Sequence, residues 1–215
     1  MRNTKIMNLT LAALFSALAF LAVFLFRIPV VLFLKYEFKD AIIALEALIL
    51  GPWYAVITSL VVSLIEMVSI SDTGPIGAIM NVLSTVTYIL PVALLYKRKK
   101  TLPTAVTGLA LGVVIMTVCM LLWNYLITPW YMETPREVVA GMLLPYFLPF
   151  NLLKGTLNTA VTLLLYKPIM NALRRMNLIP KSDSTHKGGT LAIVINIAAI
   201  IVVVALVVTL IILNV

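Results

Sequence analysis

Long apolar segments separated by short charged stretches dominate this sequence, and they restrict its fold more than any motif does. There are seven of them, at residues 8–26, 40–50, 53–70, 76–96, 103–127, 138–170 and 190–213. Most approach the length of about 20 residues that an α-helix needs to cross a membrane. Only 11% of the residues are charged, whereas a soluble domain has about 25%. The sequence therefore predicts an all-α integral membrane protein, a six-helix transmembrane bundle with an appended seventh C-terminal transmembrane helix.

The positions of these segments divide the chain into three regions. Residues 1–179 contain the first six segments and form the predicted six-helix membrane domain. Residues 180–189 form a cytoplasmic linker rich in Ser, Lys and Gly, and residues 190–215 form the additional transmembrane helix. The second segment is too short to span alone, because a helix over 40–50 is about 17 Å long and the hydrocarbon core is about 30 Å thick. We expect that neighbouring helices shelter it, or that residues before it lie at membrane depth.

The basic residues predict how the chain is oriented in the membrane. With the N-terminus in the cytoplasm, eleven of the sixteen basic residues fall on the cytoplasmic side and four in external loops. Cytoplasmic loops carry such an excess, so we expect a multi-pass plasma-membrane protein with a cytoplasmic N-terminus. The basic residues cluster at segment ends, where anionic lipid headgroups lie, which argues against a nucleic-acid partner. Two aromatic, charged connections at residues 27–39 and 128–137 are predicted to be external loops that lie on the membrane surface or fold over a pocket.

The stretch L-P-F-N-L-L-K-G-T-L-N at residues 148–158 places polar side chains inside the sixth apolar segment. Its Asn151, Lys154 and Asn158 share one face of a helix, because they are spaced by three and seven residues. A lysine at membrane depth is costly unless it meets a ligand, a partner residue or a water-filled cavity. We interpret this face as one wall of a ligand-binding pocket.

Polar residues in three other segments are predicted to lie at a similar depth. Asp40, Asn81 and Asn124 fall near the outer ends of the second, fourth and fifth segments. The sixth segment is predicted to leave the membrane on the cytoplasmic side near Lys167, thirteen residues after Lys154. Thirteen residues of helix span about 20 Å of a core about 30 Å thick, so Lys154 lies roughly 10 Å below the outer edge of the core. Polar groups that converge from several helices are typical of a ligand pocket, which we place in the outer half of the membrane.

Other roles for these residues remain open from the sequence alone. Lys154 could extend its amine to the membrane surface, and the asparagines could form hydrogen bonds between helices. Asp40 could cap its helix. Glu46 and Glu66 could pair with a lysine or stay protonated within the packing.

The sequence contains no recognisable enzymatic motif. The single histidine, His186, lies in the predicted linker, and there is neither a phosphate-binding loop nor a cluster of carboxylates. The single cysteine, Cys119, permits no intramolecular disulfide. We therefore predict no catalytic residues and no metal site, and ligand recognition is favoured over catalysis.

Several motifs together resemble a known family. They are the alanine-rich first segment, the Gly-Pro that ends the second, and the runs G-P-I-G-A-I-M-N (74–81), W-N-Y-L-I-T-P-W-Y (123–131) and L-P-F-N-L-L-K-G (148–155). This combination is similar to the substrate-binding S component of energy-coupling factor (ECF) vitamin transporters, and the last two runs resemble its riboflavin-specific branch. Two features depart from the family. Asp40-Ala41-Ile42 stands where members often have an acid-x-Pro sequence, and the seventh segment lies outside the usual six helices.

The resemblance implies a protein that binds riboflavin, with FMN as a second candidate ligand, as a transported molecule rather than a cofactor. It implies a transmembrane coupling subunit and two cytoplasmic ATPases as partners, so that ATP hydrolysis would belong to the partners. It also implies that Ala13 and Ala17, as an AxxxA pattern, contact the coupling subunit. The flavin-binding N-x-x-K pattern would be Asn151 and Lys154, joined by Asn124 and the acidic Asp40.

Three alternatives stay open at this point. The first is an S component for another vitamin, such as pantothenate or a deazapurine. The second is a membrane-bound enzyme that acts on a lipid-linked substrate. The third is a scaffold protein whose polar residues only pack the helices.

Overall fold

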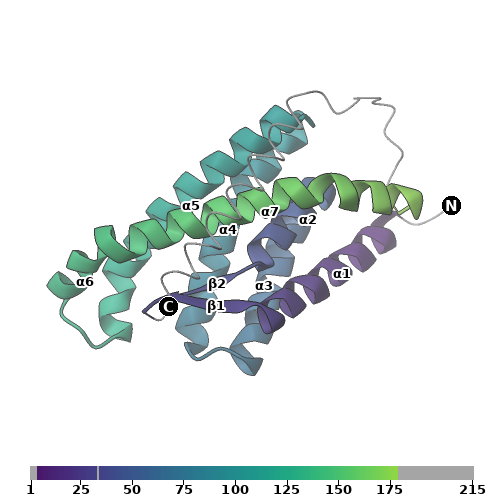
Figure 1. Cartoon of the computed structure of the whole chain (residues 1–215). Coiled ribbons are helices and arrows are strands. Elements are labelled where there is room, and N and C mark those ends of the chain that lie inside the picture. Colours follow the sequence, from purple (N-terminus) through teal and green to yellow (C-terminus); the bar gives the residue numbers. More distant parts are fainter. Residues whose placement is uncertain (1–3, 33, 179–215) are drawn as a thin grey trace.

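The computed structural model of the chain describes residues 4–32 and 34–178 (Figure 1). The predicted linker at 180–189 and the additional helix at 190–215 lie outside these described residues. In chain order the elements are α1 (Thr4–Leu25), β1 (Arg27–Val31), β2 (Leu34–Glu37), α2 (Lys39–Leu50), α3 (Pro52–Ser69), α4 (Gly74–Arg98), α5 (Leu102–Tyr131), α6 (Arg136–Met142), the π-helical turn η1 (Leu143–Phe147) and α7 (Leu148–Arg175).

The described part of the chain is mostly helical, as predicted, and built for a membrane. Five helices are long and apolar enough to cross one: α1, α3, α4, α5 and the continuous run formed by α6, η1 and α7. Their outward faces carry many exposed large apolar side chains, including Leu122 and Leu144, as expected for helices that face lipid. The chain is therefore a membrane protein. Helix α2, which corresponds to the second apolar segment, is too short to span a membrane.

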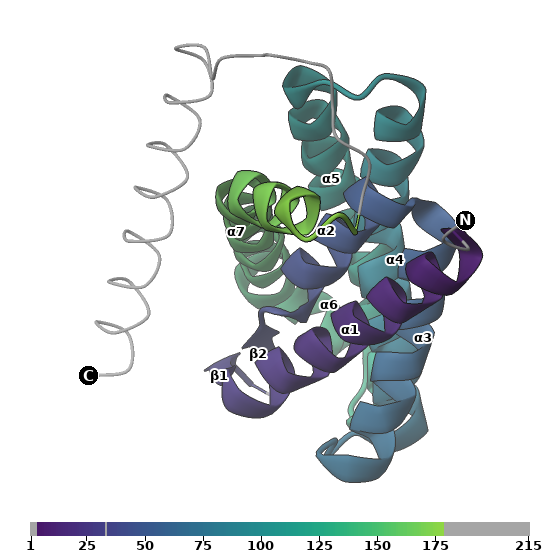
Figure 2. The ribbon, with the colours of Figure 1, turned by 90° about the vertical axis from the view of Figure 1, so that its right-hand side faces the viewer.

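The short helix α2 lies at the centre of the bundle, in contact with α1, α3, α4 and α7 (Figures 1 and 2). Nine of its twelve residues are buried. It ends at Gly51, whose φ of 95° suits glycine, and Pro52 then begins α3. Neighbouring helices thus shelter α2, which was one of the two arrangements expected for a segment of this length.

Residues 27–37 correct the all-α prediction, because they form a two-stranded antiparallel hairpin. β1 pairs with β2, with Arg27 opposite Glu37 and Ile28 opposite Tyr36. The β-branched residues of R-I-P-V-V favour an extended backbone. Leu34 of the hairpin packs in a buried cluster with side chains of α6, η1 and α7, so the hairpin is fixed against the last helical segment.

The loop predicted at residues 128–137 is also wrong in its extent. Helix α5 continues to Tyr131 and α6 begins at Arg136, so only residues 132–135 lie outside a helix. The Thr128 hydroxyl donates to the Asn124 side-chain oxygen at 2.8 Å. The helix continues through Pro129, which lies in its last turn, and the Met132 N–H donates to the Thr128 backbone oxygen at 2.8 Å.

Two prolines, Pro145 and Pro149, lie within the sixth apolar segment without interrupting its helical run. Pro145 lies in the π-helical turn η1, whose wider hydrogen-bonding pattern accommodates a residue without an N–H. Pro149 lies in the first turn of α7, a position that tolerates proline. One long helical run therefore carries the polar face of residues 148–158 alongside the bundle.

Glycines allow the helices that carry this site to approach closely. A Cβ atom on Gly108 of α5 would lie 2.5 Å from the Val92 Cα of α4. A Cβ on Gly155 of α7 would lie 2.9 Å from a methyl group of Val113 on α5. Close packing of α4, α5 and α7 therefore depends on small residues, as is common between membrane helices.

Candidate ligand-binding site

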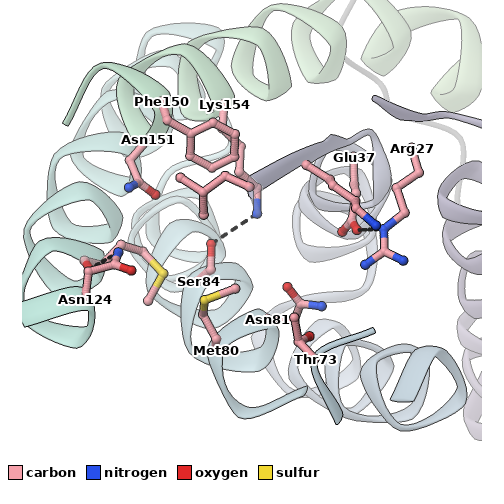
Figure 3. A pocket seen from close by; sticks show the side chains of 13 residues that line it. Arg27, Glu37, Thr73, Met80, Asn81, Ser84, Asn124, Phe150, Asn151 and Lys154 are labelled. Carbon is pink, nitrogen blue, oxygen red and sulfur yellow. Dashed lines mark hydrogen bonds and ion pairs between the residues drawn. The ribbon is translucent and has the colours of Figure 1, made fainter. Parts of the chain in front are cut away.

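A cavity with about 570 Å³ of empty space, partly open to solvent, lies where the hairpin meets α4, α5 and α7 (Figure 3). The lining residues come from the hairpin (Arg27, Leu34, Lys35, Glu37), the α3–α4 connection and α4 (Thr73, Met80, Asn81, Ser84), α5 (Met120, Asn124) and α7 (Phe150, Asn151, Lys154).

Four of the six residues predicted to bind a ligand line this cavity together: Asn81, Asn124, Asn151 and Lys154. The amide groups of Asn124 and Asn151 donate to backbone oxygens of their own helices, at Met120 and Phe147, each at 2.7 Å. The side-chain oxygen of Asn151 has no such protein donor within the described residues. These amides are thus held in place by the protein and still border the cavity.

Lys154 is 5% exposed and points into the bundle, so its amine does not extend toward the membrane surface. The amine lies 2.9 Å from the Asp40 carboxylate and donates to the Ser84 hydroxyl at 3.3 Å. The other carboxylate oxygen of Asp40 accepts the Thr85 hydroxyl at 2.6 Å. Lys154 therefore has a protein partner on one side and the cavity on the other, as Figure 3 shows for its contact with Ser84.

The remaining two predicted residues, Asp40 and Asn158, lie behind the wall of the cavity. Asp40 is fully buried and contacts Lys154 rather than the open space. The side-chain oxygen of Asn158 accepts the Tyr36 hydroxyl at 3.2 Å. Asp40 of α2 thus holds the amine of Lys154, and Asn158 of α7 holds Tyr36 of the hairpin.

A second group of buried charges joins the hairpin to α2 and α3. The Glu37 carboxylate lies 3.0 Å from the Arg27 guanidinium and 3.1 Å from the Lys39 amine. The same amine contacts both oxygens of Glu66, at 2.7 and 2.8 Å. Burial alone would raise the pKa of Glu37, but the nearby cations Lys39, Lys154 and Arg27 hold that pKa below its usual range. Each buried charge in the group thus has an opposite partner, as buried charges require.

Two contacts attach the hairpin to the connection between α3 and α4. Arg27 donates to the backbone oxygen of Ile70 at 2.7 Å, and the Lys35 amine lies 2.6 Å from the Asp72 carboxylate. The hydrogen bond from Lys35 lowers the pKa of this exposed carboxyl. The hairpin therefore contacts structure on both sides of the cavity, α7 on one and the α3–α4 connection on the other.

Sequence reasoning did not identify the hairpin residues or Ser84 as part of the site. Ser84 has a recognisable signal, because it lies three residues after Asn81 on the same face of α4. Lys35 and Glu37 lie two residues apart on β2 and both line the cavity, but a strand of four residues is too short for its period of two to be read from the sequence. The pairing of Lys39 with Glu66 joins residues far apart in the sequence and left no local pattern.

The alanines predicted to contact a partner lie on the outer face of α1. Ala13 and Ala17 are exposed, whereas Ala12, Phe15 and Ala19 are buried against the bundle. Another helix could approach this surface closely, since both side chains are small. The partner contact itself stays a prediction.

A bundle of helices able to cross a membrane, with a cavity lined by polar side chains from several of them, is typical of a membrane-embedded substrate-binding protein. Within the described residues, no group of three or more His, Cys, Asp and Glu side chains is placed to hold a metal ion. The model of the family described as "ECF transporter, substrate-specific component" matches residues 7–166. The chain belongs to this family.

Individual relatives agree with this family. The chain is 30% identical to the riboflavin transporter FmnP of Bacillus subtilis (strain 168), over 75% of this chain and 91% of the relative. It is 28% identical to the riboflavin transporter RibU of Staphylococcus aureus (strain TCH60), over 76% and 90%. A solved structure, described as that of the S component of a bacterial ECF transporter, superposes with a TM-score of 0.66 and 30% identity and covers 78% of this chain and 98% of that one.

Proposed function

We propose that this protein is the substrate-binding membrane subunit of an ECF-type transporter for riboflavin uptake, with FMN as a second ligand. The observation that supports it best is the convergence of Asn81, Asn124, Asn151 and Lys154 on one cavity. The names of the relatives supply the ligand class. In this proposal the protein is not an enzyme and riboflavin is its cargo rather than a cofactor.

The chemistry of the cavity suits a flavin. Riboflavin has a flat, largely apolar ring system with carbonyl and imide groups at one edge and a chain of hydroxyl groups. Apolar side chains such as Met80, Met120 and Phe150 offer contacts for the ring. Amides can both donate and accept hydrogen bonds, and the Lys154 amine donates only. Buried polar contacts of this kind discriminate strongly, because an analogue that lacks the matching group leaves them unpaired.

We place the cavity on the outer side of the membrane, with the N-terminus in the cytoplasm. Helix α4 supports this orientation, because it carries Asn81 near its start and the basic run at residues 97–100 at its other end. Basic residues favour the cytoplasmic side. In the full proposal six helices form the binding domain, residues 180–189 form a cytoplasmic linker, and residues 190–215 add a seventh transmembrane helix.

The proposed partners are a transmembrane coupling subunit and two cytoplasmic ATPases, which would carry out ATP hydrolysis. The exposed Ala13 and Ala17 on α1 support a contact with a helix of the coupling subunit. Riboflavin would enter the cavity from outside beneath the hairpin. Release into the cytoplasm would then depend on the partners.

Riboflavin titration of detergent-purified protein, followed by quenching of flavin fluorescence, tests the proposal. We expect saturable binding by the wild-type protein and by Lys167→Ala, and weaker binding by Lys154→Ala. The two lysines lie on the same helix, but Lys167 is exposed and Lys154 lines the cavity. Binding of another vitamin without riboflavin, turnover of a lipid-linked substrate, or equal binding by both variants would contradict the proposal.

A further inference from the structure

Glu66, in the last turns of α3, is buried without touching the cavity. It is 1% exposed and is absent from the cavity lining. The Lys39 amine carries donors only, and it donates to both oxygens of Glu66, at 2.7 and 2.8 Å. A buried carboxylate so close to a binding site and outside the proposed contacts needs an explanation.

One contact links Glu66 to the cavity. The side-chain nitrogen of Asn81 donates to Glu66 Oε2 at 3.0 Å, and Asn81 is half-buried and lines the cavity. An amide has a donor end and an acceptor end. Because both oxygens of Glu66 act as acceptors, Asn81 turns its NH₂ group to Glu66 and its oxygen the other way. Figure 3 shows this oxygen toward the middle of the lining residues and the nitrogen away from it.

We propose that Glu66 is a positioning residue that fixes the amide of Asn81 so that its oxygen faces the bound ligand. The cavity then presents an acceptor at this point, and it selects ligands with a hydrogen-bond donor there. This inference rests on the proposed function. In a flavin the matching donor is the imide N–H or a hydroxyl of the side chain.

Lys39 makes this arrangement rigid. Glu66 is held from two directions, by Lys39 of α2 and by Asn81 of α4. The Lys39 amine also lies 3.1 Å from Glu37, and it thereby connects Glu66 to the hairpin. A glutamine at position 66 would carry both a donor and an acceptor, and the amide of Asn81 could then reverse.

A double-mutant cycle on riboflavin affinity tests the inference. We expect Glu66→Gln and Asn81→Ala each to raise the Kd for riboflavin about tenfold, the value of roughly one hydrogen bond. Because Glu66 acts through Asn81, the double variant should bind no more weakly than Asn81→Ala alone. Multiplying effects, of about a hundredfold in the double variant, would overturn the inference and indicate separate structural roles. An unchanged Kd for Glu66→Gln would overturn it as well.

Ligand analogues provide a second measurement that does not need the Glu66 variant to fold. The analogues are 3-methylriboflavin, which lacks the imide N–H, and riboflavin derivatives that each lack one hydroxyl. We expect the wild-type protein to bind at least one of them about tenfold more weakly than riboflavin. The Asn81→Ala variant should bind that analogue and riboflavin with similar Kd values. If Asn81→Ala removes none of these differences in Kd, the inference fails while the proposed function stands. If the wild-type protein does not bind riboflavin, both fail.

Discussion

Replacing Lys154 by methionine should separate two roles of its amine, because the same group contacts Asp40 and borders the cavity. The amine lies 2.9 Å from a carboxylate that is fully buried. Methionine keeps much of the length of the side chain and removes the charge. The variant therefore leaves the carboxylate with the Thr85 hydroxyl as its remaining partner among the described residues.

The two roles predict different magnitudes. Breaking a buried ion pair by removing one partner costs about 3–5 kcal/mol of stability. A hydrogen bond from a charged group contributes about 1.5–3 kcal/mol, so loss of a ligand contact should raise the Kd for riboflavin about 10- to 150-fold. Lysine has three donors. Asp40 and Ser84 engage two of them, and one remains for a ligand.

The double variant Asp40→Asn with Lys154→Met distinguishes the roles. It removes the unpaired carboxylate, so we expect most of the lost stability to return, while riboflavin affinity stays low. Thermal unfolding in detergent without ligand measures the first quantity, and flavin fluorescence quenching measures the second. Lys35→Met is the matched control for stability, because its pair with Asp72 is exposed and should contribute little to the free energy of unfolding.

Two results would refute this reasoning. If the single Lys154→Met variant unfolds at the wild-type temperature, the ion pair does not stabilise the bundle. If the double variant binds riboflavin as the wild-type protein does, the amine makes no contact with the ligand, and the proposed role of Lys154 fails.

Three further predictions concern the packing and the partner surface. Glu46 is fully buried with no ion pair among the described residues. Glu46→Gln should therefore change the free energy of unfolding in detergent by less than about 1 kcal/mol. A larger loss of stability would indicate a charged partner for Glu46. Gly108→Ala should lower the free energy of unfolding by about 1–3 kcal/mol, because its Cβ would meet the α4 backbone. Gly141→Ala, with open space around it, should be neutral or slightly stabilising. Equal effects of the two substitutions would argue against close packing of α4 and α5. Replacing Ala13 and Ala17 by leucine should abolish uptake of labelled riboflavin by cells and leave riboflavin binding by the purified protein intact. Unimpaired uptake would show that these two residues do not contact the partner.

The long helices and the core of the site could be predicted because a membrane makes polar residues conspicuous. Lys154 and the three asparagines of the cavity stood out as polar groups within apolar segments, and each lies at a depth that helix geometry gives directly. The structure brings these four residues together around one cavity. Their contact with a ligand remains a prediction.

The hairpin could not be predicted in the same way. Residues 27–37 mix basic, aromatic and β-branched side chains around Pro29, and such a short segment gives no helical or strand period long enough to read. The sequence left a lysine partner for Glu66 as an open alternative but did not indicate which lysine, since Lys39 lies 27 residues away. Tertiary contacts of this kind have no local signal.

The distribution of charge around the cavity favours a polar but uncharged ligand, and so favours riboflavin over FMN as the ligand in the proposed function. Each basic residue of the lining, namely Arg27, Lys35 and Lys154, lies within an ion-pair distance of a carboxylate. These charges therefore offset one another before any ligand arrives, and a neutral ligand does not disturb that balance. The polar surface left for recognition consists of amide oxygens, hydroxyls and one remaining donor on Lys154. Discrimination at such a site depends on matching hydrogen bonds, because a missing partner leaves a buried polar group unsatisfied.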